Sequence, residues 1–220
     1  MIFYSHDREV LTDFIKYTPR SCFVMTQLGG EIPKLVTNIR QELSKVLKQN
    51  NIKEIDANTL ITGRDFLNKI WKQMLGVPIG IAIVSDEMQM GTIANIFYEI
   101  GVLNALGKDT IVVKSKDFKI PSDFVRTEYI SYDGKFLTKI NHFLSDVLEL
   151  AEHYDVMAEN LENNPSLSID YWRRAFLISG DYKYLSKAKQ FFLANKFDKQ
   201  TTIFIKNFLS AEKNKASPPD

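Results

Sequence analysis

Hydrophobic residues follow two alternating patterns between residues 21 and 132. Short runs that are apolar at nearly every position are typical of strands buried on both faces of a sheet, whereas apolar residues three and four positions apart are typical of amphipathic helices. The strands predicted in this way are residues 22–25, 52–55, 79–84, 110–113 and 128–132. The helices predicted between them cover residues 32–47, 63–75 and 93–106. This alternation predicts an α/β fold, a flavodoxin-like doubly wound parallel sheet of about five strands.

The pattern after Lys135 indicates helices only. A long helix over residues 136–151 precedes a break at Asn163-Asn164-Pro165, and the helices predicted after it cover residues 171–178, 184–193 and 199–209. The expected organisation is an N-terminal helical segment (1–20), an α/β domain (21–155), a helical appendage (156–212) and a disordered tail (213–220). The appendage resembles tetratricopeptide-like repeats, but a solenoid needs about three units and it holds about one and a half, which favours a small helical bundle.

Composition and charge exclude several classes of protein. The 28 Lys and Arg balance 27 Asp and Glu to a net charge of +1, which argues against a surface built to bind nucleic acid. A single cysteine, Cys22, excludes an internal disulfide, and with only three His it leaves a Cys/His metal site without ligands. No apolar run approaches the ~18 residues of a membrane span, and the acidic N-terminus is unlike a signal peptide. We therefore expect a cytoplasmic protein with no membrane or nucleic-acid partner, no metal and no cofactor.

Four short segments follow the predicted strands at the edge where doubly wound sheets bind ligands: residues 26–30, 62–65, 85–95 and 115–117. Gly29-Gly30 has the place of a phosphate-binding loop, but the chain has neither Gly-x-Gly-x-x-Gly nor Gly-Lys-Ser/Thr, so a tight turn is favoured. Gln27 can bind a base or be an exposed turn residue. Asp65, at the start of the second helix, can bind a ligand or cap that helix.

Glu99 is the candidate with the most specific position. It lies four residues after Asn95 and seven after Thr92, so the three share one edge of the third helix, beside its apolar stripe. Gly101 follows closely, and we expect it to let the backbone of a neighbouring segment approach. A carboxylate in such a place can stabilise a ribosyl oxocarbenium ion or attack it as a nucleophile. From spacing alone, however, an ordinary surface Glu is the favoured interpretation.

The block around Glu99 resembles a known family. Met90-Gly91-Thr92, followed by the run from Asn95 to Val113 (NIFYEIGVLNALGKDTIVV), is similar to the Asn-Val-Phe-Tyr-Glu-Leu-Gly … Ala-Leu-Gly-Lys motif of TIR-like predicted nucleotide-binding domains. These domains are relatives of the nucleoside 2-deoxyribosyltransferases. The likeness covers about residues 21–132, although the segment from Asp86 to Asn95 lacks the family's Pro beside the Asn and carries two Met residues.

The resemblance implies roles for three residues. Glu99 matches the catalytic carboxylate that cleaves or exchanges an N-glycosidic bond. Asn95 matches an Asn expected near the ribose or at the helix cap, and Asp86 resembles the family's acidic residue that orients the ligand. The resemblance also implies a nucleotide-type small molecule, such as NAD, as substrate or ligand, and a homo-oligomer in which a neighbouring copy completes the site.

Three hypotheses follow. The first is an enzyme that cleaves or transfers the N-glycosidic bond of a nucleoside, a nucleotide or NAD with Glu99 as its catalytic carboxylate, a defence or stress effector in the family's manner. The second is a non-catalytic nucleotide-binding sensor that signals through its helical end. The third is a scaffold whose helical end is the working surface.

Overall fold

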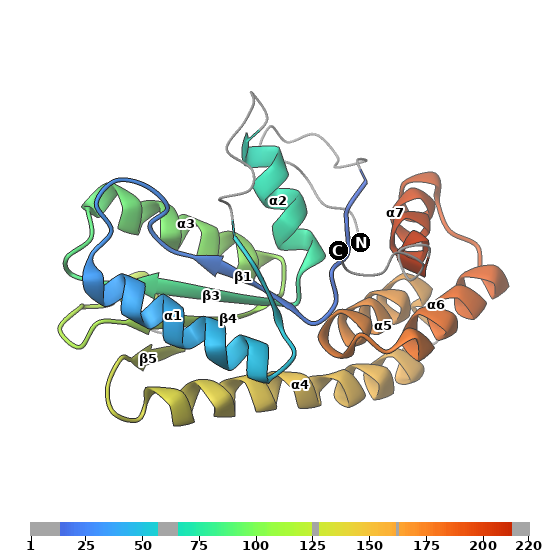
Figure 1. Cartoon of the computed structure of the whole chain (residues 1–220). Coiled ribbons are helices and arrows are strands. Elements are labelled where there is room, and N and C mark those ends of the chain that lie inside the picture. The colour runs from blue at the N-terminus through green and yellow to red at the C-terminus, as the bar shows by residue number, and fades with distance from the viewer. Residues whose placement is uncertain (1–13, 57–65, 125–127, 162, 213–220) are drawn as a thin grey trace. The chain divides into compact units, whose positions relative to one another are not determined.

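The computed structural model describes residues 14–56, 66–124, 128–161 and 163–212 (Figure 1). The chain divides into two compact units, a sheet unit and a helical unit. The sheet unit comprises Arg20–Gly63 and Val77–Val147. The helical unit comprises Met1–Pro19, Arg64–Gly76 and Leu148–Asp220.

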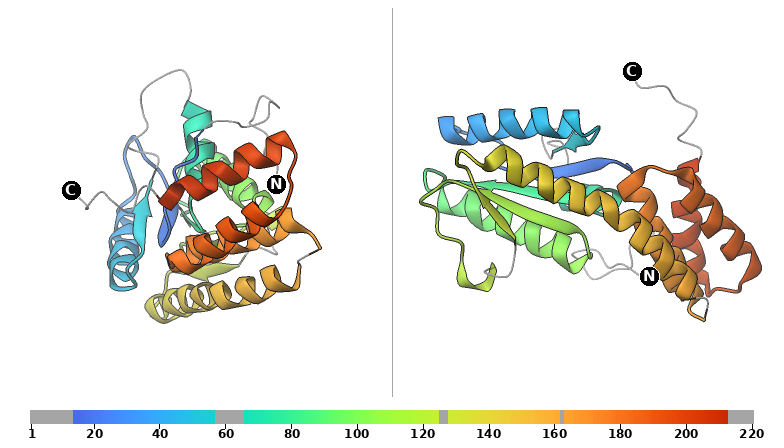
Figure 2. Two further views of the ribbon diagram at one scale, coloured as in Figure 1. Left: turned by 90° about the vertical axis from the view of Figure 1, so that its right-hand side faces the viewer. Right: turned by 90° about the horizontal axis from the view of Figure 1, so that it is seen from below.

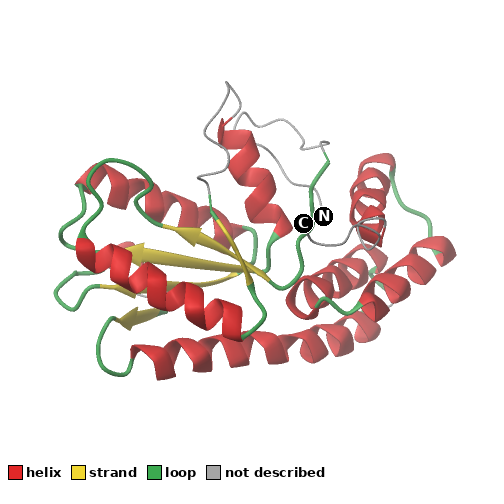
Figure 3. Cartoon of the chain, in the orientation of Figure 1, coloured by secondary structure: helices red, strands yellow, loops and turns green. Residues whose placement is uncertain are grey.

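The sheet unit contains five parallel strands in the order β2-β1-β3-β4-β5, drawn yellow in Figure 3. The strands are β1 (Ser21–Met25), β2 (Lys53–Ile55), β3 (Ile79–Val84), β4 (Asp109–Lys114) and β5 (Tyr129–Ser131). Every residue of β1 and β3 is buried, as expected for central strands covered on both faces. This strand order confirms the predicted flavodoxin-like, doubly wound α/β fold.

Helices cover both faces of the sheet. Helix α1 (Lys34–Gln49) and the first part of α4 (Phe136–Asn160) lie on one face, and α3 (Met90–Ala105) lies on the other (Figure 2). Right-handed crossovers produce this division, because β1–α1–β2 and β3–α3–β4 progress in opposite directions along the sheet. Two hydrogen bonds of 2.9 Å link α1 to the chain around α4, from Asn50 Nδ2 to Asn141 Oδ1 and from Tyr132 Oη to Glu42 Oε1.

The close approach of α3 to the sheet occurs at Gly80 rather than at Gly101. A Cβ atom on Gly80 would lie 2.4 Å from Leu103 Cδ1 and 3.2 Å from Met25 Cε, so any larger residue there would force the Leu103 side chain to shift. A Cβ on Gly101 would meet no atom of the described residues within 4 Å. Among the described residues Gly101 therefore faces open space, and the neighbouring backbone expected there is not found among them.

A loop rather than a long helix connects β4 to β5. It contains a single turn of 3-10 helix, η2 (Ser122–Phe124), and its aromatic residues pack on α3. The ring of Phe97 lies 6.4 Å from that of Phe118 and 4.7 Å from that of Phe124. These contacts cover part of the α3 face of the sheet unit.

The helical unit contains α2 (Phe66–Gly76), the end of α4, α5 (Pro165–Ser179), α6 (Tyr182–Ala194) and α7 (Lys199–Leu209). The predicted break at 163–165 is confirmed, and α5 begins there because Asn164 caps it and Pro165 occupies its first turn. Asp181 and Asp198 accept hydrogen bonds from the first amides of α6 and α7. Residues 14–18 have no regular secondary structure, and the rest of the predicted N-terminal helix and the tail lie outside the described residues.

An ion cluster lies in the core of the helical unit. Nε and Nη2 of Arg173 donate to Asp170 Oδ1 at 3.0 and 2.7 Å, and Arg174 Nε donates to Asp170 Oδ2 at 3.0 Å. The side chains of Asp170 and Arg173 are 4% and 2% exposed. Burial alone would raise the pKa of Asp170, but the charges of the two arginines outweigh it and hold that pKa below its ordinary value.

No helix among the described residues is both long enough and apolar enough to cross a membrane.

Candidate functional site

The strands of the sheet unit end at a common edge, and the strand order reverses between β1 and β3. The chain leaves β1 toward β2 on one side and leaves β3 toward β4 on the other. In doubly wound sheets this switch point opens a crevice at the carboxyl ends of the strands. The residues that follow β1, β3 and β4 are therefore the first candidates for ligand contacts.

The residues after β1 include two buried polar side chains. Gln27 is 6% exposed, and its Nε2 donates to the carbonyl oxygens of Gly29 at 2.9 Å and Glu31 at 3.1 Å. Thr26 is 7% exposed. Gln27 Oε1 and Thr26 Oγ1 are both buried and have no hydrogen-bond partner among the described residues. The interpretation of Gln27 as an exposed turn residue is therefore wrong.

The residues after β3 and β4 are joined by a hydrogen bond. Ser115 Oγ donates to Asp86 Oδ1 at 2.5 Å, and the Ser115 amide donates to Val84 at 3.0 Å. This hydroxyl holds the pKa of the exposed Asp86 carboxyl below its ordinary value. The sequence had selected residues 115–117 only as a segment, and it carried no signal that Ser115 would meet Asp86. Asp86 is thus a fixed, ionised carboxylate at the strand edge.

Lys114, at the end of β4, shapes the next loop. Its side chain is buried, and Nζ donates to the carbonyl oxygens of Ser115 at 3.3 Å, Lys116 at 3.1 Å and Phe118 at 2.8 Å. The ammonium also lies 5.8 Å from the centre of the Tyr129 ring. With its donors used in this way, Lys114 holds the loop that carries Ser115.

Glu99 lies on α3, the tenth of its residues, so the rise of a helix places its Cα about 13 Å from the start of α3. Its side chain is half-buried, and burial raises the pKa of its carboxyl to about 7. Within the described part of the chain, no group donates a hydrogen bond to this carboxylate and no cation pairs with it. Glu99 is therefore a shielded carboxyl that takes up a proton close to neutral pH.

The edge of α3 that carries Glu99 is unevenly exposed. Thr92 is half-buried, Asn95 is exposed and Val102 is buried. Since α3 begins at Met90 with Gln89 as its N-cap, Asn95 lies inside the helix and does not cap it. A contact between Asn95 and a ribose remains a prediction.

Asp65, the remaining candidate, lies outside the described residues together with the rest of the segment 62–65. The candidates that lie within the described residues are therefore Gln27 and Thr26 after β1, Asp86 held by Ser115 at the end of β3, and Glu99 and Asn95 further along α3. No group of three or more His, Cys, Asp or Glu residues in the described ranges is arranged to hold a metal ion.

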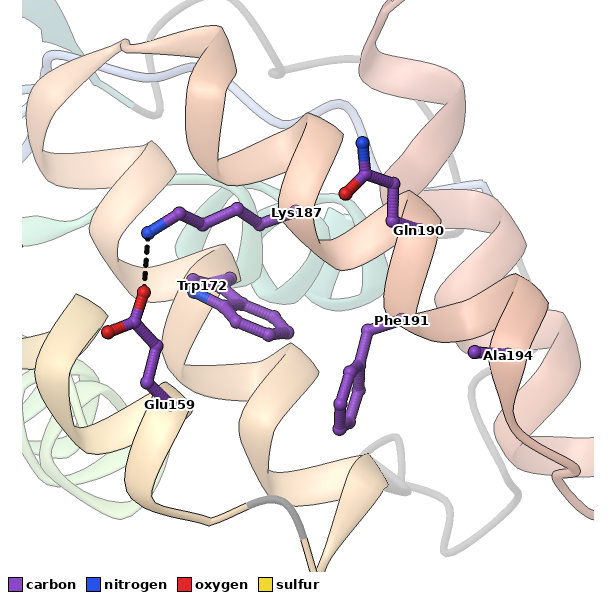
Figure 4. A pocket seen from close by; sticks show the side chains of 6 residues that line it. All are labelled: Glu159, Trp172, Lys187, Gln190, Phe191 and Ala194. Carbon is purple, nitrogen blue, oxygen red and sulfur yellow. Dashed lines mark hydrogen bonds and ion pairs between the residues drawn. The ribbon is translucent and has the colours of Figure 1, made fainter.

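A pocket of about 360 Å³ lies in the helical unit (Figure 4). It is lined by Glu159, Trp172, Lys187, Gln190, Phe191 and Ala194. The rings of Trp172 and Phe191 meet edge to face with centres 5.3 Å apart. Lys187 Nζ donates to Glu159 Oε1 and to both oxygens of Asp155 at 2.8 Å, and Trp172 Nε1 donates to Asp155 Oδ1 at 2.9 Å. The polar groups of this pocket are thus largely used within the helical unit.

Comparisons with models of protein families, with curated proteins and with solved structures find no match to this chain.

Proposed function

We propose that the protein cleaves or transfers the N-glycosidic bond of a nucleoside, a nucleotide or NAD, with Glu99 as its catalytic carboxylate. The observation that carries the proposal is the state of Glu99, which is half-buried, without an ion-pair partner in the described residues, and has a pKa raised to about 7. A carboxyl that no neighbouring charge stabilises lowers the stability of the fold when it ionises, and such groups gather at functional sites.

The chemistry requires a carboxylate beside the ribosyl C1′ atom. When the bond from C1′ to the base nitrogen breaks, its electron pair leaves with the base and C1′ becomes positive. The Glu99 carboxylate either balances that charge or forms a bond to C1′. Water then releases the sugar and restores the carboxylate, or an incoming base takes the place of water in a transfer reaction.

Asp86 supports the proposal as a ligand-binding residue. Its carboxylate is exposed at the end of β3, it is oriented by the Ser115 hydroxyl, and its lowered pKa keeps it ionised at neutral pH. An ionised carboxylate accepts hydrogen bonds from two neighbouring hydroxyls, the arrangement that a ribose presents.

The test is product formation by the full chain. The wild type, Glu99→Gln and the control Glu152→Gln, whose side chain is exposed on α4, are incubated with NAD, ATP and deoxynucleosides, and free base is resolved by chromatography. We expect release of base by the wild type and the control, and a loss of about 10³-fold or more in Glu99→Gln with its circular dichroism unchanged. Equal turnover by Glu99→Gln would remove Glu99 from the mechanism.

A second candidate function is a nucleotide-binding sensor without chemistry, which signals through the helical unit. The pocket beside Trp172 and Phe191 favours it, because its apolar floor offers a place for a partner's side chain. In that case nucleotides raise the melting temperature of both the wild type and Glu99→Gln, and no free base forms.

A further inference from the structure

The amide of Gln27 has a fixed orientation. Nε2 donates to the carbonyl oxygens of Gly29 and Glu31, and an amide oxygen in that place would face two other oxygens. The turn that carries these two carbonyls includes Gly30, which adopts φ +71°. The oxygen of the amide is therefore the end that points away from its own loop.

The oxygen of this amide is a buried acceptor that no described residue supplies with a donor. Gln27 is 6% exposed, and no group among the described residues donates to Oε1. A buried polar atom left unpaired costs free energy, and the two bonds made by Nε2 prevent the amide from turning to relieve that cost. The hydroxyl of Thr26, the preceding residue, is also buried and has no partner in the described part of the chain. Both groups follow β1, the strand beside the switch point of the sheet.

We propose that Gln27 Oε1 accepts a hydrogen bond from an N–H group on the base of the ligand. The site then selects bases that carry an exocyclic amine or a carboxamide. This inference rests on the proposed function and names its substrate class. Adenine, cytosine and nicotinamide carry such a donor. Hypoxanthine, uracil and nicotinic acid carry an oxygen in its place, which would face the Gln27 oxygen without a proton between them.

A polar pocket group left without its partner discriminates strongly between two ligands of the same shape. A site built around a hydrogen bond rejects the analogue that lacks it far more effectively than an apolar pocket rejects a ligand with one methylene more or less. The fixed amide strengthens this effect, because exchanging its oxygen for its nitrogen would break two hydrogen bonds to the backbone.

The experiment measures binding in the Glu99→Gln background, which removes turnover as a complication. Three pairs of probes are titrated by calorimetry: adenosine and inosine, cytidine and uridine, and nicotinamide riboside and nicotinic acid riboside. We expect the amino or carboxamide member of at least one pair to bind at least about tenfold more tightly. The pair that shows the preference identifies which of the three donors the site reads.

Gln27→Met, which keeps the length of the side chain and removes the amide, should reduce that preference to less than about threefold. The matched control is Gln41→Met, whose glutamine is exposed on α1, and it should keep the preference. Melting curves of both variants report whether the fold survives. If Gln27→Met does not fold, the preference of the parent protein between the members of each pair still decides the question.

The outcomes separate this inference from the proposed function. Equal binding within all three pairs, preference for the oxygen-bearing members, or a preference that persists in folded Gln27→Met overturns the role of Gln27 and leaves the proposed function standing. Absence of binding by all six probes overturns the inference, and the release of base from NAD, ATP and deoxynucleosides decides the proposed function separately.

Discussion

Two shielded carboxyl groups, Asp170 in the helical unit and Glu99 in the sheet unit, differ in their charged partners and in the direction in which their pKa is shifted. Asp170 accepts three hydrogen bonds from two arginines, and its pKa lies below the ordinary value despite its burial. Glu99 has no such partner within the described residues, and burial raises its pKa to about 7. The ionised carboxylate of Asp170 therefore stabilises the helical unit through its arginine partners, whereas Glu99 lowers the stability of the fold whenever it ionises.

The difference indicates which acid is structural. Asp170 uses both of its oxygens within the protein, so little of its capacity remains for a ligand. Within the described residues, no hydrogen-bond donor or cation pairs with the Glu99 carboxylate, and no donor meets the acceptor oxygen of Gln27. Groups that a fold leaves unsatisfied at a stability cost are better candidates for function than groups that it satisfies.

The largest expected effect on stability is that of Asp170→Asn. Removing this charge leaves Arg173 buried without its counterion, and breaking a buried ion pair from one side costs about 3–5 kcal/mol. Both tryptophans, Trp71 and Trp172, belong to the helical unit, so urea unfolding followed by tryptophan fluorescence reports on it. The control Asp146→Asn removes an exposed carboxylate that pairs with His142 and should change the free energy of unfolding by less than about 0.5 kcal/mol. Equal effects of the two variants would show that Asp170 is not a structural ion.

The next effect is a gain in stability from Glu99→Gln that depends on pH. The folded pKa of about 7 lies above the ordinary 4.5, so the folded state binds the extra proton between these values and stability falls as pH rises through them. Gln carries no such cost. At pH 8 the variant should therefore be more stable by about 1–3 kcal/mol, a value discounted for partial exposure, and at pH 4 the two proteins should be alike. Thermal unfolding by circular dichroism at both pH values measures this difference, and a gain at pH 4 as large as at pH 8 would rule out ionisation as its source.

The smallest effect concerns the rate. If the ionised form of Glu99 is the active one, kcat/KM should rise about tenfold between pH 6 and pH 8, with a midpoint near 7. The profile is measured with a substrate that does not itself titrate in that range. A profile that is flat between these pH values, or one that falls with pH, would show that ionisation of Glu99 does not activate the reaction.

The hydrophobic pattern predicted the sheet more completely than the site. The five strands and their parallel arrangement follow from apolar runs such as Ile79–Val84. A strand buried on both faces is apolar at nearly every position, so it is easily recognised in the sequence. The ends of helices were less accurate. Helix α3 begins at Met90, three residues before the first residue of its apolar stripe, because helix starts depend on backbone geometry as well as on hydrophobic spacing.

The candidate site was predicted less completely than the sheet. The sequence selected Glu99, Asp86 and Gln27 by type and position, but it gave Gln27 an exposed alternative and assigned the close approach of α3 to Gly101. The structure instead buries Gln27 and places the close approach at Gly80. Burial depends on which distant segments come together, and no local spacing encodes that.

The sequence by itself determined the order of strands and helices, since each element buries its own periodic face, and it determined which residue types follow each strand. The tertiary structure alone decided which of those residues are paired. Ser115 orients Asp86 across 29 positions of the chain, two backbone carbonyls fix the amide of Gln27, and Glu99 is left with a raised pKa and no partner in the described residues. The physical reason is that periodicity is a property of neighbours along the chain, whereas hydrogen bonding and desolvation depend on neighbours in space.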